Sequence, residues 1–119
     1  MTDKVSLSEK FALFSDYWSP KIVGQIGDMH VKLVKIEGEF IWHSHEVEDE
    51  MFFVTKGQMT MHFRNREVVV NPGEFIIIPH GEEHMPACED ETYIMLIELA
   101  STVNTGEEES ERTTIPNKI

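Results

Sequence analysis

Hydrophobic and polar residues alternate along much of the middle of the chain. The clearest case is residues 59–64, where methionine and phenylalanine side chains alternate with polar ones. A period of two places successive side chains on opposite faces of an extended strand, so this stretch predicts a half-buried β-strand. Runs rich in β-branched and aromatic residues predict further strands over residues 31–36, 41–45, 51–55, 68–70, 75–78 and 92–99.

Glycine, proline and asparagine separate these predicted strands. Gly57 and the 71–73 sequence Asn-Pro-Gly are strong turn signals, and residues 64–67 and 79–83 predict two further turns. Helical periodicity is missing between the strands, which argues against an α/β fold. Many short strands joined by such turns indicate a sandwich or a barrel, so we predict an all-β fold.

One short helix is predicted near the N-terminus, over residues 6–14. Ser6 and Glu9 have the spacing of a capping box, and Leu7, Phe11 and Phe14 share one face of this helix. The length of 119 residues suits one domain. We expect three parts, which are a helical extension over 1–20, a β-barrel over 21–101, and a polar, acidic tail over 102–119. The tail is expected to be either disordered or an arm that lies on a partner subunit.

The charge of the chain disfavours several classes of partner. With 22 acidic and 10 basic residues, the net charge is −12 at pH 7, which disfavours binding to nucleic acid and to anionic membrane surfaces. No apolar run approaches the roughly 18 residues that span a bilayer, and residues 1–10 lack the apolar core of a secretory signal. The lone Cys88 cannot form a disulfide within the chain. We therefore expect a soluble cytoplasmic protein that binds neither nucleic acid nor membrane.

The candidate chemistry lies in three histidines and one glutamate. His43 and His45 are two residues apart, so they share a face of an extended segment. Glu50 follows a short acidic turn and His84 follows the turn at 79–81, and a closed β structure can bring all four to one interior point. Imidazoles and a carboxylate suit a divalent transition metal and leave coordination positions open. Buried ionisable groups that converge in this way need a cation to be tolerated.

The spacing of these residues resembles the two motifs of the cupin superfamily. The first motif reads His43-x-His45, four residues, Glu50, six residues, Gly57, and the second reads Gly73, five residues, Pro79-x-Gly81, two residues, His84. The short stretch between them, residues 58–72, is typical of compact single-domain members. Residues 42–45, 49–52 and 103–106 further resemble the small cupin-2 proteins that are often labelled mannose-6-phosphate-isomerase-like, a label that reflects fold and not reaction.

Two positions depart from the cupin motifs. Gly38 precedes His43 by five residues where the family usually has six, which leaves the role of this glycine open. Cys88 stands where the second motif often ends in asparagine. An asparagine there would orient groups in the pocket, so Cys88 is a candidate for a thiol at the pocket mouth or a fifth ligand. The alternative for Cys88 is a small, buried apolar group.

The resemblance implies a double-stranded β-helix, the jelly-roll cupin barrel, with one divalent transition metal inside it. The implied ligands are His43, His45, Glu50 and His84, and Fe, Mn, Zn, Ni and Co all suit this set. No other cofactor is expected. The strand patterns also give candidates for the pocket wall, namely Phe52, Val54, Met61, Phe63 and Cys88, and two further interior residues, Met59 and Phe75.

Three functions fit this interpretation. The first is a small-molecule metalloenzyme of dioxygenase, isomerase or lyase type, whose catalytic residues stay unassigned. A separate general base would come from Glu48, His80 or Cys88. The lack of Lys and Arg at pocket-facing motif positions weakens phosphosugar isomerisation, because a phosphate needs a cationic clamp. The second function is a non-catalytic module that binds or senses a small molecule, and the third is a structural protein stabilised by its metal.

Two further expectations concern the surface. A jelly roll leaves edge strands that need to be covered, so we expect a homodimer in which residues 21–26 or the C-terminal arm pair with a neighbour. His30, His62 and His80 are interpreted as surface histidines, because they lie at a strand start, on the polar face of a strand and in a turn.

Overall fold

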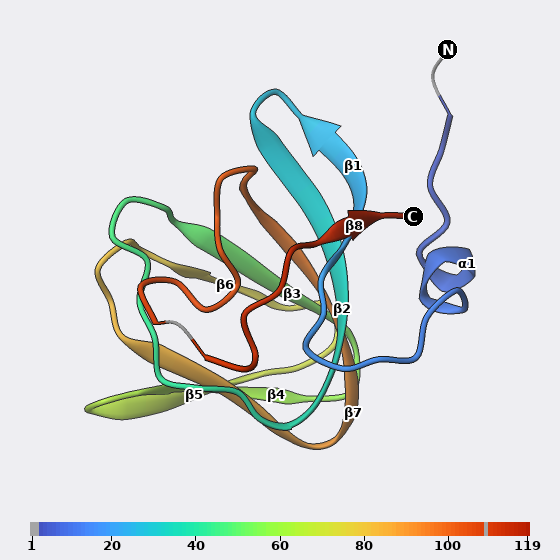
Figure 1. The fold of residues 1–119 in the computed structure, drawn as a ribbon. Coiled ribbons are helices and arrows are strands. Elements are labelled where there is room, and N and C mark those ends of the chain that lie inside the picture. Colours follow the sequence, from blue (N-terminus) through green and yellow to red (C-terminus); the bar gives the residue numbers. More distant parts are fainter. Residues whose placement is uncertain (1–2, 109) are drawn as a thin grey trace.

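The computed structural model describes residues 3–108 and 110–119, and these form a β-barrel with one short helix beside it (Figure 1). The elements in chain order are α1 (Leu7–Phe11), β1 (Lys21–Ile26), β2 (Met29–Glu39), β3 (Glu50–Lys56), β4 (Met59–Phe63), β5 (Arg66–Val70), β6 (Phe75–Ile78), β7 (His84–Leu99) and β8 (Asn117–Lys118). The predicted all-β class with a short N-terminal helix is confirmed. Within the described ranges, no helix has the length and apolar character needed to cross a membrane.

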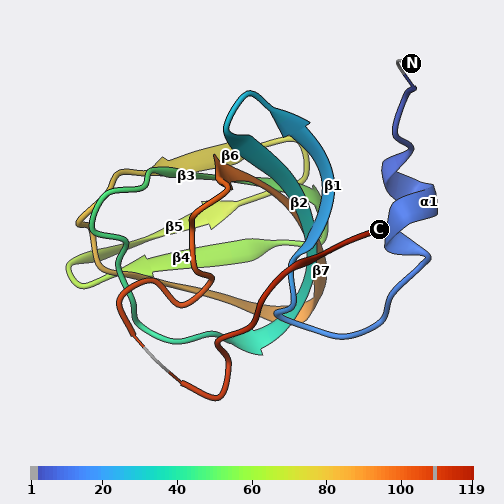
Figure 2. The same ribbon diagram turned by 45° about the horizontal axis from the view of Figure 1, so that its top comes forward.

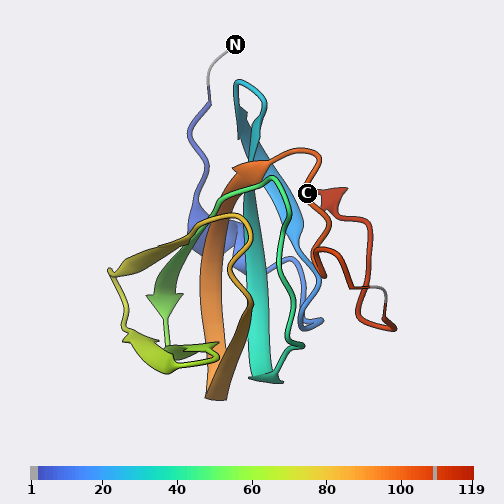
Figure 3. The ribbon, with the colours of Figure 1, turned by 90° about the vertical axis from the view of Figure 1, so that its left-hand side faces the viewer.

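Strand β7 is the centre of the barrel. It is antiparallel to β2, β3 and β4, and the strands follow the order β5-β4-β7-β2-β1-β8, with β3 joining β7 to β6. The first residues of β7 pair with β4, whereas its second half pairs with β3. One long strand therefore takes part in both walls, and the sheet curls around an interior space (Figures 2 and 3).

Several predicted elements differ from those observed. The predicted strand over 41–45 is wrong, since only His43 forms a β-bridge there, with His84. The predicted strand over 92–99 is the second half of a longer strand, β7, which already begins at His84. The helix ends at Phe11 and not at Phe14, and the Phe14 carbonyl instead accepts a hydrogen bond of 2.6 Å from Lys35 Nζ. Its predicted start is right, because Ser6 Oγ caps the helix by accepting from the Glu9 N–H.

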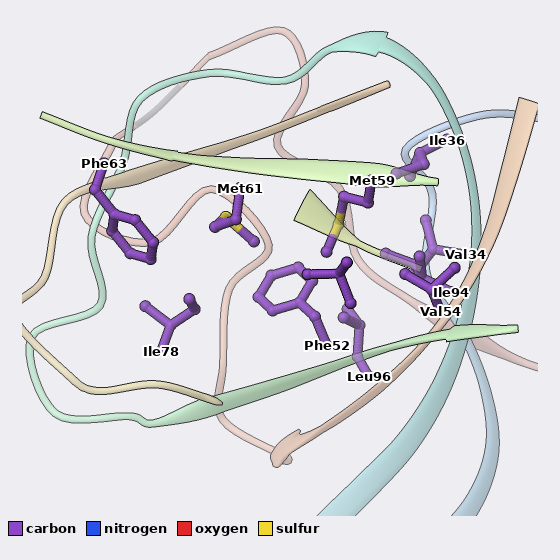
Figure 4. Packing of buried hydrophobic residues seen from close by; sticks show 11 residues of the cluster. Val34, Ile36, Phe52, Val54, Met59, Met61, Phe63, Ile78, Ile94 and Leu96 are labelled. Carbon is purple, nitrogen blue, oxygen red and sulfur yellow. The ribbon is translucent and has the colours of Figure 1, made fainter. Parts of the chain in front are cut away.

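Apolar side chains from the inner faces of the strands form one core. This core consists of Val34, Ile36, Phe52, Val54, Met59, Met61, Phe63, Val70, Ile78, Ile94 and Leu96 (Figure 4). Alternate residues of β3 and β4 are buried, as the period of two predicts. The placement of Phe75 in the interior is wrong, because β6 pairs only with β3 and Phe75 is 58% exposed.

The C-terminal segment lies along its own barrel. Strand β8 pairs in parallel with β1, and Lys10 Nζ donates to the Ile119 carbonyl at 2.7 Å. Asn104 lies at the start of the loop before β8, and its side chain binds the end of that loop. Its Nδ2 donates to the Arg112 carbonyl, and its Oδ1 accepts from the Thr114 N–H. The sequence left open a disordered tail or an arm on a partner. The observed contacts instead tie this segment to the chain that carries it.

Candidate metal centre

Four buried side chains converge inside the barrel. One potential ligand atom from each of His43, His45, Glu50 and His84 lies within 4.8 Å of the other three. The backbone holds two of them together, because the N–H groups and carbonyls of His43 and His84 exchange hydrogen bonds of 3.0 and 2.9 Å. Glu50 is the first residue of β3. The geometry therefore brings together all four residues that the sequence analysis selected.

Two of the imidazoles are held in a defined tautomer. His43 Nδ1 lies 2.9 Å from the Ile41 carbonyl, and His84 Nδ1 lies 2.9 Å from the Glu82 carbonyl. A carbonyl oxygen only accepts, so both Nδ1 atoms carry the proton. The Nε2 atom of each ring in this tautomer presents a lone pair to the centre of the cluster, as a metal ligand does.

At the centre of the cluster lie buried polar atoms that have no hydrogen-bond partner among the described residues. Glu50 Oε1 lies 2.8 Å from His45 Nε2 and 3.3 Å from His84 Nε2. Within the described ranges, these three buried atoms make no hydrogen bond. Buried lone pairs that face one another cost free energy unless a cation satisfies them. The donor set of three imidazoles and one carboxylate fits a divalent transition metal, so the cluster could hold such an ion.

A narrow, mostly apolar cavity of about 40 Å3 opens beside the cluster. His43 and Glu50 reach its wall, and the other lining residues are Trp18, Pro20, Val34, Ile36, Phe40, Phe52, Pro86, Ile94, Leu96, Glu98 and Asn104. The rings of Trp18 and Phe40 stack with their centroids 4.9 Å apart. Its apolar walls with metal-binding groups at one end have the character of a small-ligand site, but its volume is well below the roughly 300–1,000 Å3 of typical ligand pockets, so an organic ligand would enter only if wall residues move.

Comparison with known proteins identifies the family. A family model described as the cupin domain matches residues 29–99, more than half of the chain. The chain is a cupin. The match covers β2 to β7 and includes all four residues of the cluster, whereas Trp18, Pro20 and Asn104 of the cavity wall lie outside it.

Individual relatives extend this comparison. A cupin-2 domain-containing protein from Shewanella frigidimarina is 41% identical, with a TM-score of 0.79 over 80% of this chain and 93% of that chain. The uncharacterized protein YdbB of Bacillus subtilis is 32% identical over 66% of this chain, and the quercetin 2,3-dioxygenase of the same organism is 40% identical over 35% of it. The cupin spans 64% of the length of YdbB and 12% of that of the dioxygenase.

The cavity wall differs from the predicted one. Phe52 lines the cavity as expected. Val54, Met61 and Phe63 are buried in the core and are absent from the described lining residues (Figure 4). Cys88 lies at a separate hollow with Gly57, Gln58 and Thr60 and packs, partly buried, against the core, which agrees with the alternative of an apolar group and not with a position at the pocket mouth. Along β7, Cys88 lies four residues after His84 and pairs with Gly38 near the C-terminal end of β2. This pairing accounts for its distance from the cavity wall.

Other predicted site residues also lie away from the cavity. Glu48 approaches the outer nitrogen of His45, with its Oε1 3.8 Å from Nδ1. His80 is exposed, and its Nδ1 lies 2.9 Å from Asp49 Oδ1. His62 is partly exposed and lies 3.3 Å from Glu67. The surface assignment of His30 is only half right, because this side chain is half-buried and its Nδ1 makes no hydrogen bond within the described ranges.

Among the residues of the cavity wall that sequence reasoning missed, four have aromatic or polar side chains. Trp18 lies before the first predicted strand and Phe40 lies between the predicted strands over 31–36 and 41–45, so only the fold brings them together. Glu98 stands in a run of apolar residues near the end of β7. A charged residue inside an apolar strand is a signal that could have identified it. Asn104 falls in the 103–106 segment that drew attention only through its resemblance to cupin-2 proteins.

The buried histidine and glutamate of this cupin have shifted pKa values. Burial, with the nearby His84 ring as the next cause, lowers the pKa of His43 from 6.5 to about 4. Burial alone would raise the pKa of Glu50, but the close polar contacts of its carboxylate, with His45 and His84 first among them, outweigh burial and hold this pKa well below its ordinary value. His43 is therefore neutral and Glu50 ionised at pH 7, which is the state that binds a cation.

The pKa of His43 predicts how the metal-free protein responds to acid. The unfolded chain takes up this proton near pH 6.5 and the folded chain only near pH 4. Above pH 6.5, neutral His43 contributes about 3 kcal/mol to the free energy of unfolding. This contribution is lost as the pH falls toward 4. Urea unfolding of the wild type and of His43→Asn at pH 7, 5.5 and 4 isolates this contribution. A constant difference between the two proteins across this range would contradict the expected pKa.

Gly106 allows the C-terminal segment to cover the histidines. Its φ angle is +61°, and an added Cβ would lie 2.0 Å from the Ser44 carbonyl oxygen. The neighbouring Glu107 N–H donates to the same carbonyl at 3.0 Å. The segment thus closes over the backbone between His43 and His45.

A Gly106→Ala substitution is expected to displace this segment and to destabilise the protein by at least about 1–3 kcal/mol, because strain and overlap coincide. Limited proteolysis should then cleave after residue 100. Gly27→Ala is the matched control, since Gly27 also has a positive φ but an added Cβ there meets nothing within 4 Å. Equal protease resistance of the two variants would show that the segment does not pack as described.

Proposed function

We propose that this cupin holds one divalent transition metal through His43, His45, Glu50 and His84 and acts on a small organic molecule bound in the adjoining cavity. The observation that carries this proposal is the set of unpartnered lone pairs that meet at the centre of the cluster. The donor set would satisfy four coordination positions. A metal that accepts more ligands would keep positions for a substrate or for oxygen.

The cavity favours a neutral, largely apolar substrate. In the described part of the chain, its wall contains no lysine or arginine, so a phosphate would find no cationic clamp. This disfavours phosphosugar isomerisation and leaves dioxygenase chemistry on a small neutral molecule as the function that we propose. The local similarity to quercetin 2,3-dioxygenase supports this choice.

The chain contributes binding and exclusion of water to such a reaction. When bound, a divalent transition metal would supply Lewis acidity or oxygen chemistry at the cluster. The backbone carbonyls at Ile41 and Glu82 keep His43 and His84 in the ligating tautomer. The stacked rings of Trp18 and Phe40 provide a flat apolar surface beside His43, whose ring meets Phe40 edge-on at 5.3 Å.

An oxygen-uptake experiment tests this function. The protein is loaded anaerobically with Fe2+ and exposed to air with catechol, acetylacetone or, as the anionic comparison, glucose 6-phosphate. We expect oxygen consumption with a neutral compound and none above background with the phosphate. The His43→Ala/His45→Ala variant serves as the control for iron in solution. Equal oxygen uptake by this variant, or uptake with no compound, would contradict the proposal.

A non-catalytic binding module is the second candidate. It is favoured by the position of the expected general bases, since Glu48, His80 and Cys88 all lie outside the cavity. A binding module would retain a ligand on the metal-loaded protein without forming a product. Calorimetry with product analysis on the same compounds separates the two functions.

We also propose, from the sequence, that the protein is cytoplasmic.

We also propose a homodimer that forms through the outer face of the sheet. Across β6, β3 and β7, Ile77, Met51 and Ile97 lie in one cross-strand row, and Phe75, Phe53 and Met95 lie in the next. Phe75 and Ile77 are more than half exposed. An uncharged patch on a chain of net charge −12 is where two copies can approach without repulsion.

Light scattering tests the dimer directly. The wild type is expected at twice the chain mass of 13.8 kDa, and Phe75→Lys/Ile77→Lys is expected to be a folded monomer because it places charges within the patch. Val69→Lys, which changes another exposed apolar residue, on β5, is the control and is expected to remain dimeric. A wild type of 13.8 kDa would contradict the proposal.

A further inference from the structure

A second hollow lies outside the barrel, between α1 and the sheet (Figure 1). Its volume is about 430 Å3, which is within the roughly 300–1,000 Å3 of ligand pockets. Its helix side is mainly apolar, with Leu7 and Phe11, and its sheet side presents Lys35, Lys56 and Tyr93. The helix lies outside residues 29–99, which the cupin family model matches. The N-terminal extension of this chain therefore supplies one wall of the hollow.

The sheet side of the hollow is one cross-strand row of three residues. Tyr93 on β7 pairs with Lys35 on β2 and with Lys56 on β3. The Nζ atoms of both lysines lie 5.0 Å from the centroid of the Tyr93 ring. Phe11 of α1 stacks on the same ring, with the two centroids 4.6 Å apart. Two cations are thus held beside one aromatic ring in the wall of a mainly apolar hollow.

Within residues 3–108 and 110–119, neither of these ammonium groups has an acidic partner. The described wall contains no aspartate or glutamate, and the ion pairs of the described part of the chain include neither lysine. Lys35 is only 7% exposed, and the Phe14 carbonyl accepts from its Nζ at 2.6 Å. A carbonyl and an aromatic ring orient an ammonium group but leave its charge uncompensated, whereas buried charges are normally paired.

The composition of the chain makes this absence of acids informative. The sequence has 22 acidic and 10 basic residues, so a hollow that collects two lysines and no acid differs in charge from the rest of the molecule. Such a local excess of positive charge attracts an anion. The anion would lie between the two ammonium groups and would replace the counterion that the chain does not supply.

We propose that this hollow is a second ligand site, separate from the metal centre, and that it binds a small aromatic carboxylate. The carboxylate lies between the Nζ atoms of Lys35 and Lys56, and the ring packs against the apolar side chains of α1. This inference goes beyond the proposed function, and it requires no metal.

The chemistry of the wall favours an anion that carries an apolar ring over a hydroxyl-rich anion. Thr55 Oγ1 already donates to the Tyr93 carbonyl at 3.1 Å, and Ser8 Oγ lies 3.2 Å from Ser6 Oγ. These wall hydroxyls are therefore engaged within the chain. A small aromatic carboxylate gains charge-assisted hydrogen bonds at one end and buries apolar surface at the other.

Calorimetry with benzoate tests this site. Benzyl alcohol has the ring without the charge, and acetate has the charge without the ring. Lys56→Met removes one ammonium group and is expected to fold, because Lys56 is exposed. Arg66→Met removes an exposed cation on β5, which pairs with Glu82, and is the control for net charge. His43→Ala/His45→Ala is the control for binding of benzoate at the metal cluster.

We expect the wild type to bind benzoate with a Kd of about 1 mM or tighter. Lys56→Met is expected to bind benzoate about tenfold more weakly, because a hydrogen bond between charged groups is lost. Arg66→Met and His43→Ala/His45→Ala should bind it as the wild type does, and both comparison compounds should bind the wild type more weakly.

Three results would overturn the inference. The first is the lack of saturable benzoate binding by the wild type, and the second is wild-type affinity in Lys56→Met or equal affinity for benzyl alcohol. The third is loss of benzoate binding in His43→Ala/His45→Ala, since benzoate would then bind at the metal cluster. None of these results bears on whether the cluster holds a metal, so this inference and the proposed function fail separately.

Discussion

Replacing both His43 and His45 by alanine is expected to abolish stoichiometric metal binding and to leave the barrel folded. The substitution removes two of the four groups whose ligand atoms converge within 4.8 Å. Loss of one indirect partner of a metal ligand already costs roughly 10–100-fold in affinity, so loss of two ligands is expected to cost more than about 100-fold. The fold should persist because the bridge between His43 and His84 is made by backbone atoms.

Metal analysis after reconstitution measures this effect, together with far-ultraviolet circular dichroism. His62→Ala and His80→Ala are matched controls, because each removes an imidazole that lies outside the cluster and pairs with a surface carboxylate. Both controls should retain the metal content of the wild type. A full metal equivalent in the double variant would show that the ion binds elsewhere.

Lys32→Met alone is expected to have the largest effect on stability. Lys32 Nζ lies 2.9 Å from Glu98 Oε1, and both side chains are buried. The substitution leaves the carboxyl of Glu98 without this partner, and breaking a buried ion pair on one side costs about 3–5 kcal/mol. The double variant Lys32→Met/Glu98→Leu should recover most of that loss. Urea unfolding of the metal-free proteins gives both values.

Lys21→Met provides the comparison for this stability prediction. Its partner Asp16 has a side chain that is 54% exposed, so water can replace the lysine and the loss should be at most about 1 kcal/mol. Equal losses in Lys32→Met and Lys21→Met would contradict the buried character of the pair with Glu98.

The centre of the site could be predicted from the sequence because its information is local. Two histidines two residues apart, a glutamate at the start of the next strand and a histidine after a Pro-x-Gly turn define positions that a β fold brings together. The four residues indeed converge, although residues 41–45 do not form the strand on which we based the prediction. A bridge at His43 and the covering C-terminal segment hold this extended stretch instead.

The cavity wall could not be predicted in the same way because it depends on packing between distant segments. Trp18 and Phe40 meet only when the chain before β1 folds against the end of β2. The period of two separates inner from outer residues, but it does not separate core from cavity wall. Met61 and Phe63, predicted as cavity-wall candidates, therefore lie in the core. The exposure of Phe75 follows from the edge position of β6, which a strand pattern alone does not reveal.

Metal analysis of protein purified without oxygen tests the proposed centre most directly. We expect one transition metal ion per chain, lost in the His43→Ala/His45→Ala variant and restored to the wild type by reconstitution after chelation. Iron would direct further work to oxygen chemistry, and manganese, nickel, cobalt or zinc to ligand binding and other reactions. A wild-type protein that retains no transition metal after purification and reconstitution would contradict the assignment of these four residues as a metal site.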